Sequence, residues 1–175
     1  MGVPLNDTNA PRGLVDMFLH VKGAAKGVIQ GEAEDATHKN EIEVLGWAWG
    51  MQQKPSMGGT TASGRATLRE LEIHKNIDAS STALMSALRH NELIEKAVLT
   101  VRKGGGTNPL EYLVITIQGG RVVSLDVKID EASSSASVTE RVTFAFNKIR
   151  VEYQTQSKTG AGKGKMVFED DWTPV

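Results

Sequence analysis

The stretch GEAEDATHKNE, residues 31–41, gathers several side chains that can do chemistry. Its acidic residues and one histidine are Glu32, Glu34, Asp35, His38 and Glu41. Carboxylate oxygens on a glycine-flanked loop can bind a hard cation such as Ca²⁺. Runs of charged residues are, however, usually just exposed to solvent. We therefore favour a solvated acidic loop over a metal site, and we expect no metal in this protein.

Motifs for catalysis are missing elsewhere in the sequence. The chain has no cysteine, which removes thiol nucleophiles, thiolate zinc sites and disulfides together. Its histidines form no HExxH motif, and no GxSxG elbow is present. Asp16 and Asp126 flank strand-like segments, but spacing alone does not pair them. We expect neither an enzyme nor a bound cofactor.

The segment GAGKGK, residues 160–165, superficially resembles a phosphate-binding loop. Such a loop needs a glycine five residues before its final Gly-Lys and a Ser or Thr after it. Thr159 and Met166 occupy those two positions. We therefore interpret the segment as a mobile loop between strands.

Two tryptophans alternate with small residues in GWAWG, residues 46–50. Trp47 and Trp49 could form a platform for a sugar, but alternation along a curved strand is more typical of a buried face. We therefore expect the tryptophans to pack in the core, while Gly46 and Ala48 form a smooth face that points away from it.

Length and composition favour one soluble domain. The 175 residues can bury a core, and 20 basic against 21 acidic residues argue weakly against a nucleic-acid binder. The absence of disulfides fits a reducing cytoplasm. Residues 1–14 contain Pro4, Asp7 and Pro11 and lack the apolar core of a signal peptide. We expect a flexible extension over residues 1–14 and a single domain over residues 15–175.

Period-two patterns predict that most of the chain is β-structure. Short strands are expected near residues 16–23, 42–51, 68–75, 97–103, 140–146 and 149–156, with a β-bulge near Gly46. Residues 111–129 look like two strands joined by a hairpin turn at Gly119-Gly120. The segment IDASSTALMSALRHNELI predicts one helix of about 13 residues, capped by Asp78, Ser80 or Ser81. This set predicts an antiparallel barrel or sandwich.

An ordered set of segments resembles the haemolysin-coregulated protein (Hcp) family, the tube subunit of bacterial type VI secretion. The segments are DMFLHVKG (16–23), THKNEIEVLGWAWGM (37–51), HKNIDASSTALMSAL (74–88), AVLTVRKGGG (97–106), LEYLVITI (110–117) and ERVTFAFNKIRVEYQTQ (140–156). Trp172 resembles a tryptophan near the end of the family's chains. The resemblance spans about residues 15–172, and its specificity lies in the order of the segments.

The resemblance implies an antiparallel β-barrel with one helix packed on its side, similar to phage tail-tube proteins. It implies homohexameric rings that stack into a hollow tube, with a spike at the tip, a contractile sheath outside and small effector proteins in the lumen. It also implies synthesis in the bacterial cytoplasm and secretion without a signal peptide. The 14 residues before the first matching strand are a departure from the family, so the prediction of stacking is weaker than that of rings.

Particular residues receive roles from this resemblance. Gly46 and Ala48 are candidates to face the lumen, and Trp47, Trp49, Phe144 and Phe146 are expected in the core. A loop rich in Gly, Ser and Thr is expected to contact an adjacent subunit or ring, because it has little of its own to pack. Its candidate contact residues are Lys54, Pro55, Ser56, Met57, Gly58, Gly59, Thr60, Thr61, Ala62 and Ser63.

Two other functions remain open at this point. The chain could be a tail-tube protein of a phage-like contractile device, which would share the fold. It could also be a monomeric β-barrel that binds carbohydrate through its tryptophans. Exposed indole rings in a monomer would favour the second of these.

Overall fold

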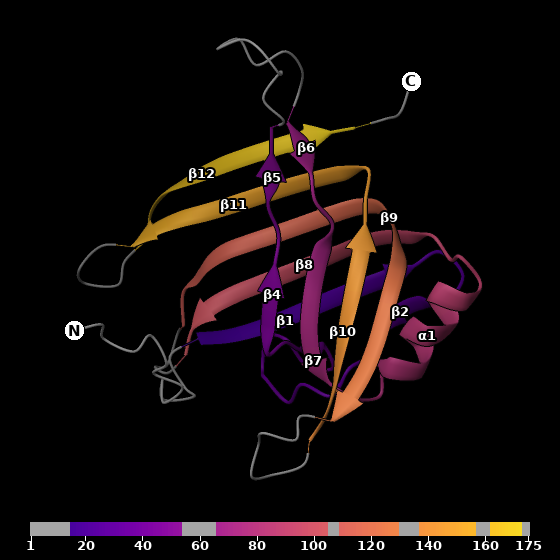
Figure 1. Cartoon of the computed structure of the whole chain (residues 1–175). Helices are drawn as coiled ribbons and strands as arrows, with labels where there is room; N and C mark the ends of the chain where they lie inside the picture. Colours follow the sequence, from indigo (N-terminus) through magenta and orange to yellow (C-terminus); the bar gives the residue numbers. More distant parts are fainter. Residues whose placement is uncertain (1–14, 54–65, 105–108, 130–136, 157–161, 173–175) are drawn as a thin grey trace, which may run out of the picture.

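Antiparallel strands make up most of this chain. A computed structural model describes residues 15–53, 66–104, 109–129, 137–156 and 162–172 (Figure 1). The strands are β1 (Val15–Gly23), β2 (Gly27–Ile29), β3 (Ile42–Glu43), β4 (Gly46–Ala48), β5 (Met51–Gln52), β6 (Thr67–Leu68), β7 (Leu71–Asn76), β8 (Ile94–Lys103), β9 (Glu111–Ile129), β10 (Val138–Ala145), β11 (Lys148–Gln156) and β12 (Gly162–Asp171). The helix is α1 (Ser81–Arg89).

The strands form two layers that share β9. Sheet A has the strand order β12-β11-β9-β8-β1. The short strands β2 and β3 both pair with β1 as well. Sheet B contains the second half of β9, then β10, β7 and β4. In Figure 1 the strands of sheet B run steeply across those of sheet A. The prediction of a mainly β, antiparallel fold with one helix packed on its side is confirmed. In place of the closed barrel that was expected, the described strands form two crossing layers joined by β9.

The predicted hairpin at Gly119-Gly120 is wrong, because β9 is one continuous strand of 19 residues. Its first half pairs with β8 and β11, and from Arg121 onward it pairs with β10. Gly119 has a φ of 60°, and a Cβ on Gly120 would lie 2.6 Å from the carbonyl oxygen of Ala145. The glycines therefore bend one strand from sheet A into sheet B, instead of reversing the chain.

The predicted bulge near Gly46 is also a change of sheet. Strand β3 pairs with β1, whereas β4 pairs with β7. The amide of Val44 donates to the carbonyl of Met17 in sheet A, and the amide of the next residue, Leu45, donates to the carbonyl of His74 in sheet B. Val44 is buried and Leu45 is exposed. The one-residue shift in the alternation of apolar positions at Leu45 is therefore the point where the chain passes from sheet A to sheet B.

Helix α1 has nine residues and is shorter than the sequence pattern predicts. Its end has the geometry of a Schellman motif, in which the amide of Glu92 donates to Ala87 and that of Asn91 donates to Leu88. Asn91 takes the left-handed conformation that this motif requires, with a φ of 52°. Ser80 is the N-cap residue, although its side chain makes no capping bond. The helix packs through Leu84 and Ala87, which are buried.

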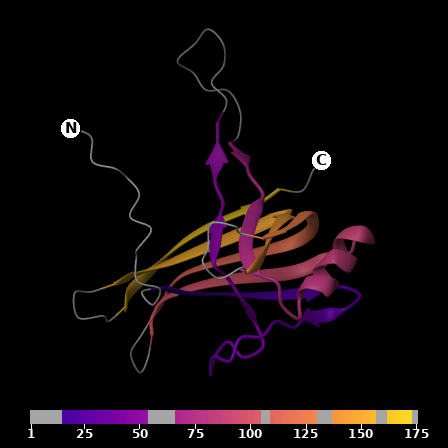
Figure 2. The same cartoon turned by 60° about the horizontal axis from the view of Figure 1, so that its bottom comes forward.

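A separate two-stranded sheet, β5 with β6, rises from the body of the molecule (Figure 2). The loop predicted to contact another subunit, Lys54–Ser63, connects these two strands and lies outside the described residues, as does the extension 1–14. The mobile loop expected over GAGKGK is wrong for the described part of that segment, because residues 162–165 belong to β12. Of these, Gly162, Lys163 and Lys165 pair with the end of β11, and residues 160–161 lie outside the described ranges.

Candidate functional site

The small residues Gly46 and Ala48 lie on β4, where Ala48 is exposed and Gly46 is half-buried. Ala48 pairs with Glu72 of β7. A shallow hollow of about 240 Å³ next to it is lined by Ala48, Trp49, Arg69, Glu70, Glu72 and Thr143. Nearby, Arg141 lies 3.4 Å from Glu72. This outer face of sheet B therefore mixes small, polar and oppositely charged groups.

The aromatic residues named from the sequence differ in depth. Phe144 is fully buried, and Trp47, Trp49 and Phe146 are half-buried and pack against the core. The ring of Trp49 lies 6.4 Å from that of Phe168 on β12. Both indoles therefore contribute to the packing between the layers.

The acidic loop 31–41 is tied to the outer face of sheet A by Arg102 of β8. The guanidinium of Arg102 donates to both carboxylate oxygens of Asp35, at 3.1 Å from Nη1 and at close range from Nη2. It also donates to the Thr37 hydroxyl and, at 3.3 Å, to Asp16 of β1. Arg102 is buried by these contacts, so the bidentate pair fixes the loop in direction as well as in position.

His38 is the second anchor of the loop. Its Nδ1 lies 2.8 Å from Glu41 and its Nε2 lies 2.9 Å from Glu111 at the start of β9. Its ring stacks on Phe18 of β1. The interpretation of a solvated acidic loop therefore holds for Glu32 and Glu34, which are exposed, and is wrong for His38, which is buried.

The hydrogen bonds in this cluster stabilise the ionised forms of Asp35 and Arg102. The hydrogen bond from Arg102 holds the pKa of the Asp35 carboxyl well below its ordinary value, and bonds from Thr37 and the His38 amide act in the same direction. The same bond to Asp35 raises the pKa of Arg102. The pair is therefore a permanent ion pair at neutral pH, suited to holding structure.

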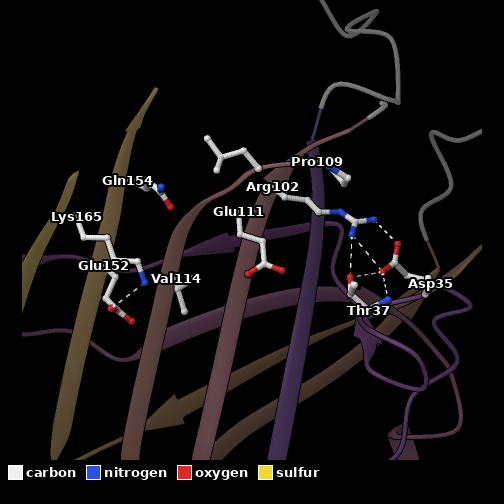
Figure 3. Close-up of a pocket in the computed structure, with 11 residues that line it drawn as sticks. Asp35, Thr37, Arg102, Pro109, Glu111, Val114, Glu152, Gln154 and Lys165 are labelled. Atoms are coloured by element: carbon white, nitrogen blue, oxygen red, sulfur yellow. Dashed lines mark hydrogen bonds and ion pairs between the residues drawn. The ribbon is translucent and has the colours of Figure 1, made fainter. Parts of the chain in front are cut away.

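A groove of about 670 Å³ runs beside this cluster (Figure 3). It is lined by Asp35, Ala36, Thr37, Arg102, Pro109, Leu110, Glu111, Val114, Glu152, Gln154 and Lys165. Glu152 is bonded to Arg150 and Lys165, and Glu111 to His38. Among the residues that the structure describes, no group of three His, Asp or Glu side chains is arranged to hold a metal ion. The groove is therefore a mainly polar cleft whose carboxylates are engaged with neighbouring basic side chains.

A buried ion cluster beneath α1 was missed in the sequence. Lys75 of β7 lies 2.8 Å from Glu140 of β10 and 2.8 Å from Asp78, and it contacts the Ser81 hydroxyl at 3.3 Å. Lys75 and Glu140 are fully buried. Their positions in the core-facing rows of β7 and β10 were the signal, since opposite charges at two inward positions predict a buried pair.

No helix within the described ranges is long and apolar enough to cross a bilayer. 

Comparison with known proteins places these features in a family. The family described as "Type VI secretion system effector, Hcp" matches residues 18–153. Protein hcp1 of Pseudomonas aeruginosa is 39% identical over 152 residues, which cover 86% of this chain and 90% of that protein. The crystal structure of Hcp1 from Salmonella typhimurium is 30% identical, with a TM-score of 0.71, and covers 91% of this chain and 95% of its own.

The same fold recurs at lower identity. Hcp1 of the E. coli EAEC 042 pathovar is 18% identical, with a TM-score of 0.75 over 90% of this chain and 99% of its own. The match of one family over most of the chain, and the 39% identity to a relative across nearly its whole length, identify the protein: this chain belongs to the Hcp family of type VI secretion proteins.

Proposed function

We propose that this chain is a structural subunit of the inner tube of a type VI secretion apparatus. Six copies form a ring, rings stack into a hollow tube, and small effector proteins travel in the lumen. The spike at the tip and the contractile sheath outside are its other partners. The protein is made in the cytoplasm and leaves with the tube, and no catalytic step is part of this role. Membership of the Hcp family carries the proposal.

The outer face of sheet B supports a role as the wall of a lumen. Ala48 is exposed at its edge, and the residues around the hollow beside it carry both signs of charge. A wall of small and charge-balanced groups lets a cargo pass without binding it tightly. We therefore assign Gly46 and Ala48 to the lumen.

Sedimentation velocity combined with negative-stain imaging tests ring formation. The expected species has the mass of six 18.9 kDa chains and a six-fold ring in projection. A protein that remains monomeric at high concentration, with or without residues 1–14, would contradict the proposal.

The lumen assignment is tested by Ala48→Arg. The variant should form rings normally and retain less effector when both are co-expressed, because a long charged side chain narrows the passage. Val28→Arg is a matched control, since Val28 is also exposed but lies on β2 in sheet A. Equal effector retention in both variants would place Ala48 outside the lumen.

We further propose that Lys54–Ser63 contacts an adjacent subunit or ring. Replacing these residues by a short Gly-Ser linker should leave folding intact and weaken assembly. Unchanged ring and tube formation would count against this role.

The half-burial of Trp47 and Trp49 gives no support to a carbohydrate platform. A tail-tube protein of a phage-like contractile device would share the fold. The genes beside this one, for a sheath, a spike and a disassembly ATPase, would distinguish a type VI tube subunit from such a protein.

A further inference from the structure

His38 contacts a carboxylate through each of its two ring nitrogens. Nδ1 lies 2.8 Å from Glu41 in the same loop, and Nε2 lies 2.9 Å from Glu111 at the start of β9. An ionised carboxylate only accepts hydrogen bonds, whereas a neutral imidazole has one N–H to donate. A neutral His38 can therefore bond to one of these carboxylates but not to both. The second contact requires an additional proton, which makes the imidazole a cation.

The packing of His38 keeps its ring in the plane that faces both carboxylates. The ring stacks on Phe18, and the His38 side chain is only 9% exposed. An aromatic face attracts a cation placed over it, so this stacking suits the protonated ring. Without the second proton, two hydrogen-bond acceptors would face each other in a partly buried site, which is unfavourable. The geometry therefore makes the second contact depend on the second proton.

Negative charge predominates around this histidine. The charged side chains bonded into the cluster are Asp16 of β1, Asp35 and Glu41 of the loop, Arg102 of β8 and Glu111 of β9. Lys39 and Glu43, which flank the loop end in sequence, are exposed. Because Arg102 is already bonded to Asp35 and Asp16, it leaves Glu41 and Glu111 to His38. This excess of carboxylates favours a cation at the position of the imidazole.

We propose that His38 is a pH-sensitive switch that fastens loop 31–41 to the start of β9. When the ring carries both protons, it donates to Glu41 and to Glu111. When the pH rises and the ring loses one proton, the bond to Glu41 remains and the contact with Glu111 is released. The Glu111 side chain is 43% exposed and that of Glu41 is 19% exposed, so water solvates a released Glu111 more easily. The contact is therefore present at low pH and is lost as the pH rises.

The release affects one wall of the groove beside the loop. Asp35, Ala36 and Thr37 of the loop belong to that wall, and Glu111 lines the same groove (Figure 3). The bond of Arg102 to Asp35 persists after the release, so the loop loosens without coming away from sheet A. The protonation of His38 therefore sets how firmly this wall of the groove is held.

Hydrogen exchange followed by mass spectrometry tests the switch on the purified full-length chain. The amides of Gly31, Ala33 and Asn40 are bonded within the loop and report on its order. Their protection, corrected at each pH for the exchange of an unstructured chain, would be compared at about pH 5.5 and about pH 8.5, which bracket the range where histidines change charge. Loss of one charge-assisted hydrogen bond should lower the protection about tenfold at the higher pH.

A glutamine at position 111 separates this switch from other effects of pH. The side-chain amide of Glu111→Gln can either accept from a protonated Nε2 or donate to a neutral one, so it matches both states of His38. Loop protection in this variant should change much less with pH than in the natural protein. The matched control is Glu34→Gln, because Glu34 lies in the same loop, is exposed and loses the same charge. The control should keep the tenfold decrease.

Three outcomes decide the matter. A decrease in the natural protein and in Glu34→Gln that is absent from Glu111→Gln supports the switch. Equal protection of the natural loop at both pH values overturns it. A decrease of the same size in Glu111→Gln also overturns it, because the group that titrates then acts elsewhere than through the contact of His38 with Glu111. The measurement needs no assembled ring, so a negative result leaves the proposed function in place.

Discussion

The imidazole ring of His38 lies nearly parallel to the ring of Phe18, with the centroids 4.5 Å apart and the planes at 5°. The guanidinium carbon of Arg102 lies 4.9 Å from the centroid of the same Phe18 ring. Phe18 pairs with Thr100 on the outer face of sheet A, away from the core. Its ring is nevertheless buried. Loop 31–41 therefore covers an apolar side chain while its ion pairs hold it in place.

Replacing Arg102 by Met should loosen this loop and destabilise the fold. The substitution keeps an apolar chain near Phe18 but leaves Asp35 without its bidentate partner. The Asp35 side chain is still 20% exposed, so we expect a loss between the about 0–1 kcal/mol of an exposed ion pair and the about 3–5 kcal/mol of a fully buried one. Urea unfolding would measure the loss, and hydrogen exchange should increase first in residues 31–41.

A matched control for this change is Arg150→Met. Arg150 also bonds carboxylates on the outer face of sheet A, Glu169 and Glu152, but 43% of its side chain is exposed, against 9% for Arg102. Exposed pairs contribute about 0–1 kcal/mol. If the two variants lost equal stability, the buried cluster would have no special role.

Stability should fall at acid pH in a way that depends on Asp35. Arg102 holds the pKa of Asp35 below its ordinary value, so the folded state binds this proton less readily than the unfolded state. The stabilisation is therefore fully present above the unfolded pKa of about 4 and is lost as the pH falls below it. Asp35→Asn should be less stable at neutral pH and should show a shallower decline between pH 5 and pH 3, measured by urea unfolding.

An exposed carboxylate provides the comparison. Lys148, and then Arg150, lower the pKa of Glu169, which is solvent-exposed. Salt screens such exposed pairs, so Glu169→Gln should change the acid decline only slightly and less at high ionic strength. If the stability of Asp35→Asn fell between pH 5 and pH 3 as steeply as that of the natural protein, the ion pair of Asp35 and Arg102 would not be the cause of the acid sensitivity.

Local patterns in the sequence predicted the elements well where each strand stays in one sheet. Met17, Leu19 and Val21 alternate along β1, and the structure packs them against the core. The shared face of Leu84, Ala87 and Leu88 predicts the helix. Its end at Arg89 is harder to predict, because the left-handed residue of the turn that follows is Asn91, whereas glycine is the usual residue there.

The errors come from strands that change sheets. Gly119-Gly120 reads as a turn, because glycines between two apolar runs are typical of hairpins. Only the pairing with β10 shows that the chain bends there without reversing. The anchors of loop 31–41 were missed for a related reason: Arg102 and Glu111 lie about 70 residues away, and no local period connects them to Asp35 and His38.

Gly120→Ala should be markedly destabilising. A Cβ there would lie 2.6 Å from the backbone oxygen of Ala145, so the junction between sheets A and B must shift. Overpacking of this kind costs about 1–3 kcal/mol. The control is Gly27→Ala, which has a φ of 69° and open space around it, and should cost only about 1 kcal/mol of backbone strain. Thermal unfolding that ranks Gly27→Ala as the more damaging change would contradict this account of the bend.

Removing one partner of the buried pair Lys75 and Glu140 should lower the free energy of unfolding more than replacing both partners by apolar residues. Each is fully buried, and the two charges face each other at 2.8 Å between β7 and β10. Lys75→Met alone leaves Glu140 and Asp78 as neighbouring carboxylates without their cation. We expect a loss of about 3–5 kcal/mol in urea unfolding.

The double variant Lys75→Met/Glu140→Met should recover much of that loss, because two apolar side chains of similar size fill the site without a charge to desolvate. Asp78 keeps its bonds to the amide and hydroxyl of Ser80 at the start of α1, so the helix retains its anchor. The coupling energy from the double-mutant cycle measures the pair directly. If the losses of the two single variants simply add in the double variant, the two side chains act independently, and the geometry of the pair does not stabilise the contact between β7 and β10.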